Sequence, residues 1–105
     1  MSTWLGNYIR AQRIWSLETF GKGLRTKIIL DHIKSEIKEV EAEPKKLEEW
    51  VDIIMLAVDG AWRAGHKPDD IVSGLVEKFL ENQRRDWDEN GYHILPETTS
   101  EGVKE

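Results

Sequence analysis

The chain has 105 residues, the length of a single domain, with a net charge of −5 and no cysteine. The acidic balance argues against binding to a nucleic-acid polymer, because basic patches supply the affinity for phosphate backbones. The lack of cysteine excludes disulfides and thiol catalysis. Residues 1–16 show no signal-peptide pattern and no apolar run approaches the length of a membrane span, so we expect a cytoplasmic protein that does not enter a membrane.

Three breaks, at residues 21–23, 43–45 and 65–68, divide the sequence into stretches whose apolar residues recur at helical spacing. The pattern predicts an all-α fold with helices over residues 7–18, 26–43, 47–64 and 68–88. Thr26 suits an N-cap, Gly65 a C-terminal cap and Pro68 a first helical turn. We expect one domain over residues 1–90, followed by a polar arm or disordered tail over residues 91–105.

The third predicted helix is apolar on more than one side. One stripe has the pattern of an ordinary core face: Leu47, Trp50, Val51, Ile54, Ala57, Val58 and Ala61. Ile53 and Leu56 lie off that stripe at 100° per residue. A helix of this kind usually packs on more than one side, and a chain this short buries only about two-thirds of its unfolded surface. We therefore expect a homo-oligomer, a dimer or tetramer, with Ile53 and Leu56 at the subunit contact.

Four carboxylates are grouped on the second and third predicted helices. Glu36 and Glu39 are three residues apart on one helix, and Glu49 and Asp52 are three apart on the next. This spacing places each pair on one helix face. The break at Pro44 predicts an antiparallel hairpin, which brings Glu39 near Glu49 and Glu36 near Asp52. At 1.5 Å per residue both pairs lie roughly 10 Å from the turn, so they are level with each other.

Carboxylates this close repel one another, by about 1 kcal/mol at 4 Å in bulk water and about 4 near a protein surface. A hard divalent cation such as Mg²⁺ or Mn²⁺ would relieve the repulsion and is suited to phosphate chemistry. The alternative is a solvated acidic face, which is common on Glu-rich helices. His32, one turn before Glu36, could be a ligand, a neighbour of a ligand or a structural histidine. Asp59 could join the metals or make a structural bond.

A row of cationic and amide side chains follows on the fourth predicted helix, where Lys78, Asn82 and Arg85 share one face. Lysine supplies a point charge, arginine a fork of donors that suits phosphate, and asparagine a donor for phosphate or a sugar hydroxyl. In an acidic protein such a face would suit a triphosphate. The alternative is a solvated face with salt bridges to Glu77 and Glu81.

The order of these motifs resembles the MazG-like all-α nucleotide pyrophosphohydrolases, and most closely their dATP/dGTP diphosphohydrolase branch, which includes the phage MazZ enzymes. The stretches that carry the resemblance are residues 15–21, 29–33, 49–52 and 59–66, within a similarity that extends over residues 12–87. The gap between the two acid motifs is short for MazG proteins at large but suits this branch.

The resemblance implies a four-helix bundle with a core shared between subunits, and release of a nucleoside monophosphate with pyrophosphate. It implies that the four carboxylates are catalytic and hold Mg²⁺ or Mn²⁺. It also implies phosphate contacts from Lys78 and Arg85, with Asn82 near the sugar or phosphates. If the closest relatives are MazZ enzymes, the protein acts in the cytoplasm of a bacterial host and its product feeds a phage's modified-purine synthesis.

The branch also implies a purine substrate, with guanine favoured. Trp15 and Phe20 are candidates for base stacking, although aromatic faces stack on any base and both could be core or lid residues. Asn7, Gln12 or backbone groups of residues 21–23 could contact the base edge. Two other functions stay open on the residues alone: a house-cleaning enzyme for non-standard nucleotides, and a non-catalytic helical interaction module.

Overall fold

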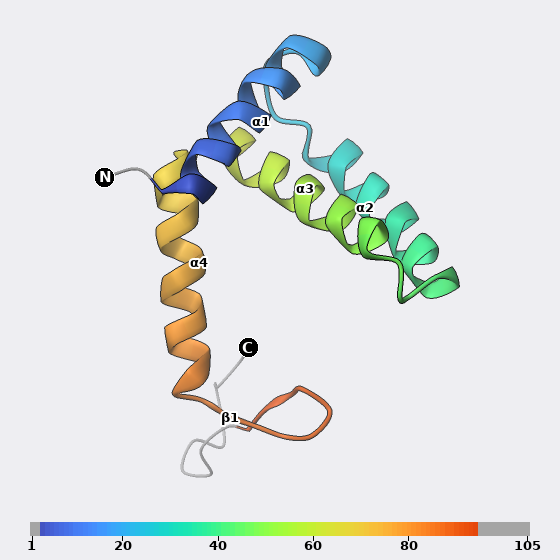
Figure 1. The fold of residues 1–105 in the computed structure, drawn as a ribbon, viewed down its shortest axis with the longest axis vertical. Helices are drawn as coiled ribbons and strands as arrows, with labels where there is room; N and C mark the ends of the chain where they lie inside the picture. The colour runs from blue at the N-terminus through green and yellow to red at the C-terminus, as the bar shows by residue number, and fades with distance from the viewer. Residues whose placement is uncertain (1–2, 95–105) are drawn as a thin grey trace. The chain divides into compact units, whose positions relative to one another are not determined.

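Four helices account for most of residues 3–94, the part of the chain that the computed structural model describes (Figure 1). A short hairpin of two strands follows them. The bounds are α1 (Trp4–Phe20), α2 (Thr26–Ala42), α3 (Leu47–Arg63), α4 (Pro68–Gln83), β1 (Asp86–Trp87) and β2 (His93–Ile94). The chain divides between Ser73 and Gly74 into two compact units. The predicted all-α class is confirmed, with the small hairpin as an addition.

The ends of the helices follow from local capping. Thr3 caps α1 by accepting a hydrogen bond from the Gly6 N–H at 3.0 Å, so this helix begins earlier than the apolar pattern predicts. Thr26 is the first helical residue of α2 and not its N-cap; Arg25 takes that position without a side-chain bond. After α3, Gly65 adopts φ 108° and donates to the Trp62 carbonyl, which confirms its predicted capping role.

The fourth helix ends at Gln83, five residues before the predicted end. Its last turn tightens through a hydrogen bond from the Arg84 N–H to the Glu81 carbonyl. The antiparallel pair β1–β2 then replaces the end of the predicted fourth helix and the first residues of the predicted arm. The Asp88 side chain holds the turn of this hairpin by accepting from the N–H groups of Asn90 and Tyr92. Residues 95–105, the rest of the predicted arm, lie outside the described residues.

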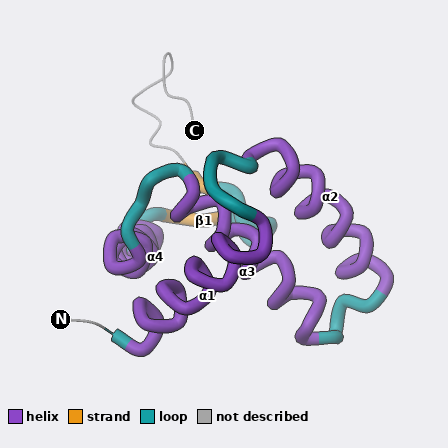
Figure 2. Tube along the Cα trace, turned by 90° about the horizontal axis from the view of Figure 1, so that it is seen from above, coloured by secondary structure: helices purple, strands orange, loops and turns teal. Residues whose placement is uncertain are grey.

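The first unit is built on an antiparallel hairpin of α2 and α3, as the break at Pro44 predicts, and α1 also packs against α3 (Figures 1 and 2). Trp50 ties the hairpin turn by donating from Nε1 to the Pro44 carbonyl at 2.8 Å. The buried apolar side chains of the described residues come from all three helices: Ile9, Ile29, Val40 and Trp62. This core is small for the number of apolar residues present.

The burial of α3 follows the predicted core stripe only in part, since Val51, Val58 and Ala61 are half-buried but other residues of the stripe are exposed. Leu47, Trp50 and Ile54, from the expected core stripe, are 74%, 49% and 59% exposed. Ile53 and Leu56, the expected subunit contacts, are half-buried inside the chain. Periodicity defines the apolar faces of a helix but not how far each is covered by its own chain, and here α1 and α2 cover both faces of α3 only partly. The placement of Ile53 and Leu56 at a subunit contact stays a prediction, since both side chains keep part of their surface exposed.

Over residues 3–94, no helix combines the length and the apolar character that crossing a membrane requires.

Candidate active site

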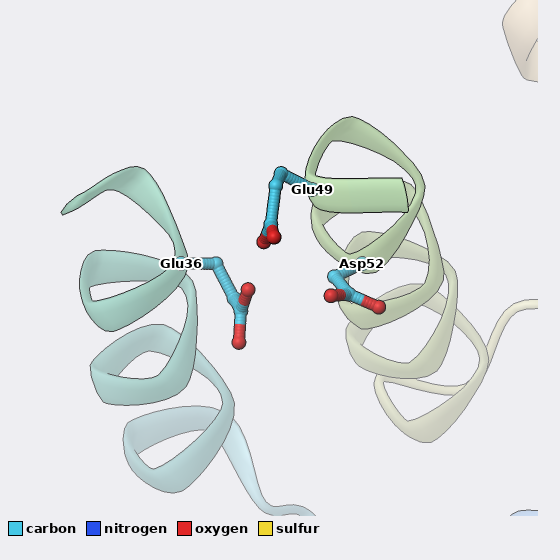
Figure 3. Close-up of side chains that lie close together, drawn as sticks. All are labelled: Glu36, Glu49 and Asp52. Atoms are coloured by element: carbon cyan, nitrogen blue, oxygen red, sulfur yellow. The ribbon is translucent and has the colours of Figure 1, made fainter. Parts of the chain in front are cut away.

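Three of the four predicted carboxylates converge between α2 and α3. One oxygen atom each of Glu36, Glu49 and Asp52 lies within 4.8 Å of the others. Figure 3 shows Glu36 extending from α2 toward the two acids of α3. The side chains of Glu36 and Glu49 are only 16% and 14% exposed. The hairpin therefore brings acids from separate motifs into one partly dehydrated cluster.

Glu49 lies in the most unfavourable environment for a negative charge. Partial burial raises the pKa of Glu49, and the nearby charges of Glu39, Asp52 and Glu36 raise it further, while Lys46 opposes the rise. The repulsion from Glu39 agrees with the predicted neighbourhood of these two residues across the hairpin. Glu39 is outside the group of three converging oxygens and is exposed to solvent.

The donor set fits a hard divalent cation. The oxygens come from carboxylates alone, which Mg²⁺ and similar ions prefer. The three oxygens lie within 4.8 Å of one another, so rotations of their side chains could bring them toward one cation. A bound cation would also relieve the repulsion that raises the pKa of Glu49.

A cavity of about 430 Å³, within the usual size range of ligand pockets, connects this cluster with aromatic side chains. Glu36 and Asp52 line it together with Trp15 and Phe20, so the cavity brings both predicted stacking residues and two of the acids to one space. The two rings meet edge to face with centroids 5.6 Å apart. The remaining lining residues are Gln12, Arg25, Ile28, Ile29, His32, Met55, Leu56 and Asp59.

His32 and Asp59, for which the sequence left more than one role possible, differ in their surroundings. His32 lies with Nε2 3.3 Å from Oε2 of Glu36, so it is a neighbour of the acidic cluster. Asp59 accepts hydrogen bonds from Ser16 Oγ, Trp62 Nε1 and Arg63 Nε, at 2.9, 2.9 and 3.4 Å. These donors occupy both oxygens of Asp59, which makes its role structural.

The sequence reasoning missed Arg63, the centre of a buried network at the end of α3. Its side chain, only 1% exposed, donates to Asp59, to Ser16 and to the carbonyls of Gly21 and Gly23. Arg63 therefore joins α1, α3 and the loop between α1 and α2. That loop begins after Phe20 and ends at Arg25, so the network holds the aromatic wall of the cavity. The only signal in the sequence was a charged residue beside the apolar Trp62.

None of the three groups predicted to contact the base edge is both in the cavity and free of hydrogen bonds within residues 3–94. Gln12 lines it, but its amide donates to the Met55 carbonyl and its Oε1 accepts from the Tyr8 hydroxyl. The carbonyls of Gly21 and Gly23 accept from Arg63. Asn7 is not among the lining residues and accepts a hydrogen bond from Arg10.

The predicted cationic face belongs to the second unit. Lys78 and Arg85 both form salt bridges with Glu81, at 3.5 and 2.7 Å. Salt bridges to Glu81 were part of the alternative that the sequence left open for this helix. Lys78 is exposed, whereas Arg85 is half-buried. The side-chain oxygen of Asn82 is buried without a hydrogen-bond partner among the described residues, and its carbonyl accepts from Trp87 Nε1.

Comparison of the chain with models of protein families finds a match to one family. The model of the dATP/dGTP pyrophosphohydrolase family matches residues 8–96, a range that includes the acidic cluster, the cavity and the predicted cationic face. No curated protein and no solved structure matches the chain.

Proposed function

This chain belongs to the dATP/dGTP pyrophosphohydrolase family, and on that premise we propose a metal-dependent reaction that favours dGTP. The enzyme hydrolyses purine deoxynucleoside triphosphates to the monophosphate and pyrophosphate with Mg²⁺ or Mn²⁺. The observation that carries the proposal is the acidic cluster of Glu36, Glu49 and Asp52 beside a cavity with aromatic walls. Phosphates and base then have separate surfaces within one site.

In this proposal Glu36, Glu49 and Asp52 hold the cation. Glu39, whose charge already acts on Glu49, completes the ligand set or orients its members. When bound, the cation polarises phosphoryl oxygens and lowers the pKa of the attacking water. His32 orients the Glu36 carboxylate from 3.3 Å.

We propose roles in substrate binding for the aromatic wall of the first unit and, on the family resemblance, for the cationic face of α4. Trp15 and Phe20 offer apolar ring surface to the base and exclude water from one end of the cavity. Lys78 and Arg85 contact the phosphates, with Asn82 near the sugar or phosphates. The buried, unpaired oxygen of Asn82 is the observation that supports a polar ligand for this residue.

A panel of nucleotides tests the reaction. The protein is incubated with dGTP, dATP, dCTP, dTTP, GTP and several non-standard triphosphates, with Mg²⁺, Mn²⁺ or EDTA, and monophosphate and pyrophosphate are separated by ion-exchange chromatography. We expect both products from dGTP and dATP, faster with dGTP, and none with EDTA. Activity with EDTA would overturn the metal dependence. Faster cleavage of non-standard nucleotides would favour the house-cleaning alternative; the family membership removes the non-catalytic one.

We also propose that the enzyme works as a homo-oligomer, through the exposed face of α3 that contains Leu47, Trp50 and Ile54. Few apolar side chains of the described residues are buried, and a large contiguous apolar surface usually marks an interface. Light scattering at micromolar concentration should give a dimer or tetramer, and Ile54→Lys should weaken it. An active 12.2 kDa monomer would refute the proposal.

We also expect, from the resemblance to MazZ enzymes alone, that the product dGMP feeds the modified-purine synthesis of a phage.

A further inference from the structure

Arg25 lies at the aromatic end of the cavity, between the α1–α2 loop and α2. It is half-buried and lines the cavity together with Trp15 and Phe20. Its guanidinium carbon lies 5.0 Å from the centroid of the Phe20 ring, a distance typical of cation–π contacts. Because Arg63 binds the Gly21 and Gly23 carbonyls, the loop that leads to Arg25 is held in place from within the core.

The guanidinium of Arg25 has unused hydrogen-bonding capacity. Over residues 3–94 none of its N–H groups has a hydrogen-bond or ion-pair partner, and the Phe20 ring is its contact. The other polar residues that line the cavity are occupied. Gln12 and Asp59 are bonded within the chain, His32 lies against Glu36, and the acids form the proposed cation site. Arg25 therefore offers donors that a ligand in the cavity could use.

The position of Arg25 favours contact with the base over contact with the phosphates. Arg25 precedes α2 and Glu36 lies eleven residues later, so their backbones are separated by roughly 16 Å along the helix. The Arg25 side chain is instead held beside Phe20, whose ring contacts Trp15. A nucleotide whose phosphates lie at the acidic cluster would extend its base toward these rings and toward Arg25.

We propose that Arg25 recognises the edge of guanine and is the residue that makes the enzyme favour dGTP. Guanine presents O6 and N7 as two adjacent acceptors, which the fork of a guanidinium can bind together. Adenine presents N7 beside an amino group, whose hydrogens face the same donors and repel them. This inference rests on the proposed function and names the residue behind its base preference.

The test compares wild type with Arg25→Ala and Arg25→Lys, with Lys22→Ala as control. Lys22 lies in the same loop and its replacement removes the same charge, but it does not line the cavity. The substrates separate the acceptors. dITP keeps O6 and N7, 7-deaza-dGTP lacks the N7 acceptor, the 2-aminopurine deoxynucleoside triphosphate lacks O6, and dATP has the amino group in place of O6. Circular dichroism verifies that each variant is folded.

For wild type and Lys22→Ala we expect dITP to match dGTP, and kcat/KM for the other three to be lower, by about tenfold or more for dATP. In Arg25→Ala the five substrates should come within about threefold of one another, because only dGTP and dITP lose a paired contact. Arg25→Lys keeps the charge without the fork, so most of the preference should also be lost. An equal loss on dGTP and dATP would overturn the proposal and indicate a phosphate contact.

Binding of the monophosphates dGMP and dAMP, measured by calorimetry, makes the test independent of turnover. Tighter binding of dGMP by wild type, lost in Arg25→Ala, supports the role of Arg25 even if the nucleotide panel finds no hydrolysis and the proposed function fails. Equal binding of dGMP and dAMP by wild type, or an unchanged difference in Arg25→Ala, would show that Arg25 does not recognise guanine.

Discussion

Arg63 and Asp59, one turn apart at the end of α3, form an ion pair in the interior of the first unit, with Nε 3.4 Å from Oδ2. The pair would be costly to bury alone. Ser16, Trp62 and the carbonyls of Gly21 and Gly23 supply the remaining partners. The network therefore supports the α1–α2 loop as well as the core.

Removal of one partner of this pair should destabilise the fold. Asp59→Asn leaves the Arg63 charge buried without compensation, and we expect a loss of about 3–5 kcal/mol in the free energy of unfolding. Urea unfolding followed by circular dichroism measures it. Asp31→Asn is the control, since it breaks the exposed pair with Lys27 and should leave the midpoint unchanged. An unchanged midpoint for Asp59→Asn would show that the network contributes little.

Amide substitutions in the acidic cluster should abolish turnover while the helices remain. Each of Glu36→Gln, Glu49→Gln and Asp52→Asn keeps the side-chain shape but removes a metal-binding charge, and we expect the same of Glu39→Gln. Glu48→Gln is the control, because Glu48 is exposed and outside the cluster. Hydrolysis of dGTP and calorimetric titration with Mn²⁺ are measured together. Near-normal activity in two of the four variants would contradict the proposed site.

Glu49 should make the metal-free protein sensitive to pH. Because burial and neighbouring acids raise its pKa, the folded state binds this proton more tightly than the unfolded state. Its contribution therefore favours the folded state below the unfolded pKa and is lost as the pH rises through the raised, folded pKa. Without metal, Glu49→Gln should raise the melting temperature at pH 7, and the gain should shrink as the pH falls through that range. Calorimetric melting between pH 4 and 7 provides the measurement.

Added Mn²⁺ is the second part of this experiment. It should raise the melting temperature of wild type at pH 7, because binding to the folded state alone stabilises it, and it should do so less for Glu49→Gln. A gain from Glu49→Gln that does not change with pH would show that the effect comes from packing and not from charge.

The cationic face of α4 should affect triphosphate handling more than folding. Lys78→Ala and Arg85→Ala each remove a charged donor, and we expect kcat/KM for dGTP to fall about tenfold or more. Arg84→Ala, an exposed neighbour, serves as the control. Both residues also pair with Glu81, so urea midpoints are measured in parallel. Wild-type kinetics in both variants would identify this row as a solvated face.

Local features of the sequence predicted much of the architecture. The break at Pro44 predicted the α2–α3 hairpin, and Gly65 predicted the end of α3, because both act through the backbone of a few residues. The spacing of the acids also predicted that both helices bring acids to one level, although Glu39 lies outside the group of three converging oxygens. The hairpin after α4 was missed because its turn depends on the side chain of Asp88.

The tertiary structure decided which faces turn inward and which polar groups are used. Helical periodicity is the same for both apolar faces of α3, so only packing against α1 and α2 could expose Trp50 and bury Leu56 partly. The role of Arg63 depends on carbonyls forty or more residues away. The free donors of Arg25 follow from the lack of a hydrogen-bond partner for its guanidinium among residues 3–94. The sequence by itself determined the helices, the hairpin and the chemistry of its acids, because these depend on near neighbours. Long-range contacts, which no local spacing encodes, determined the cavity that places those acids beside an aromatic wall.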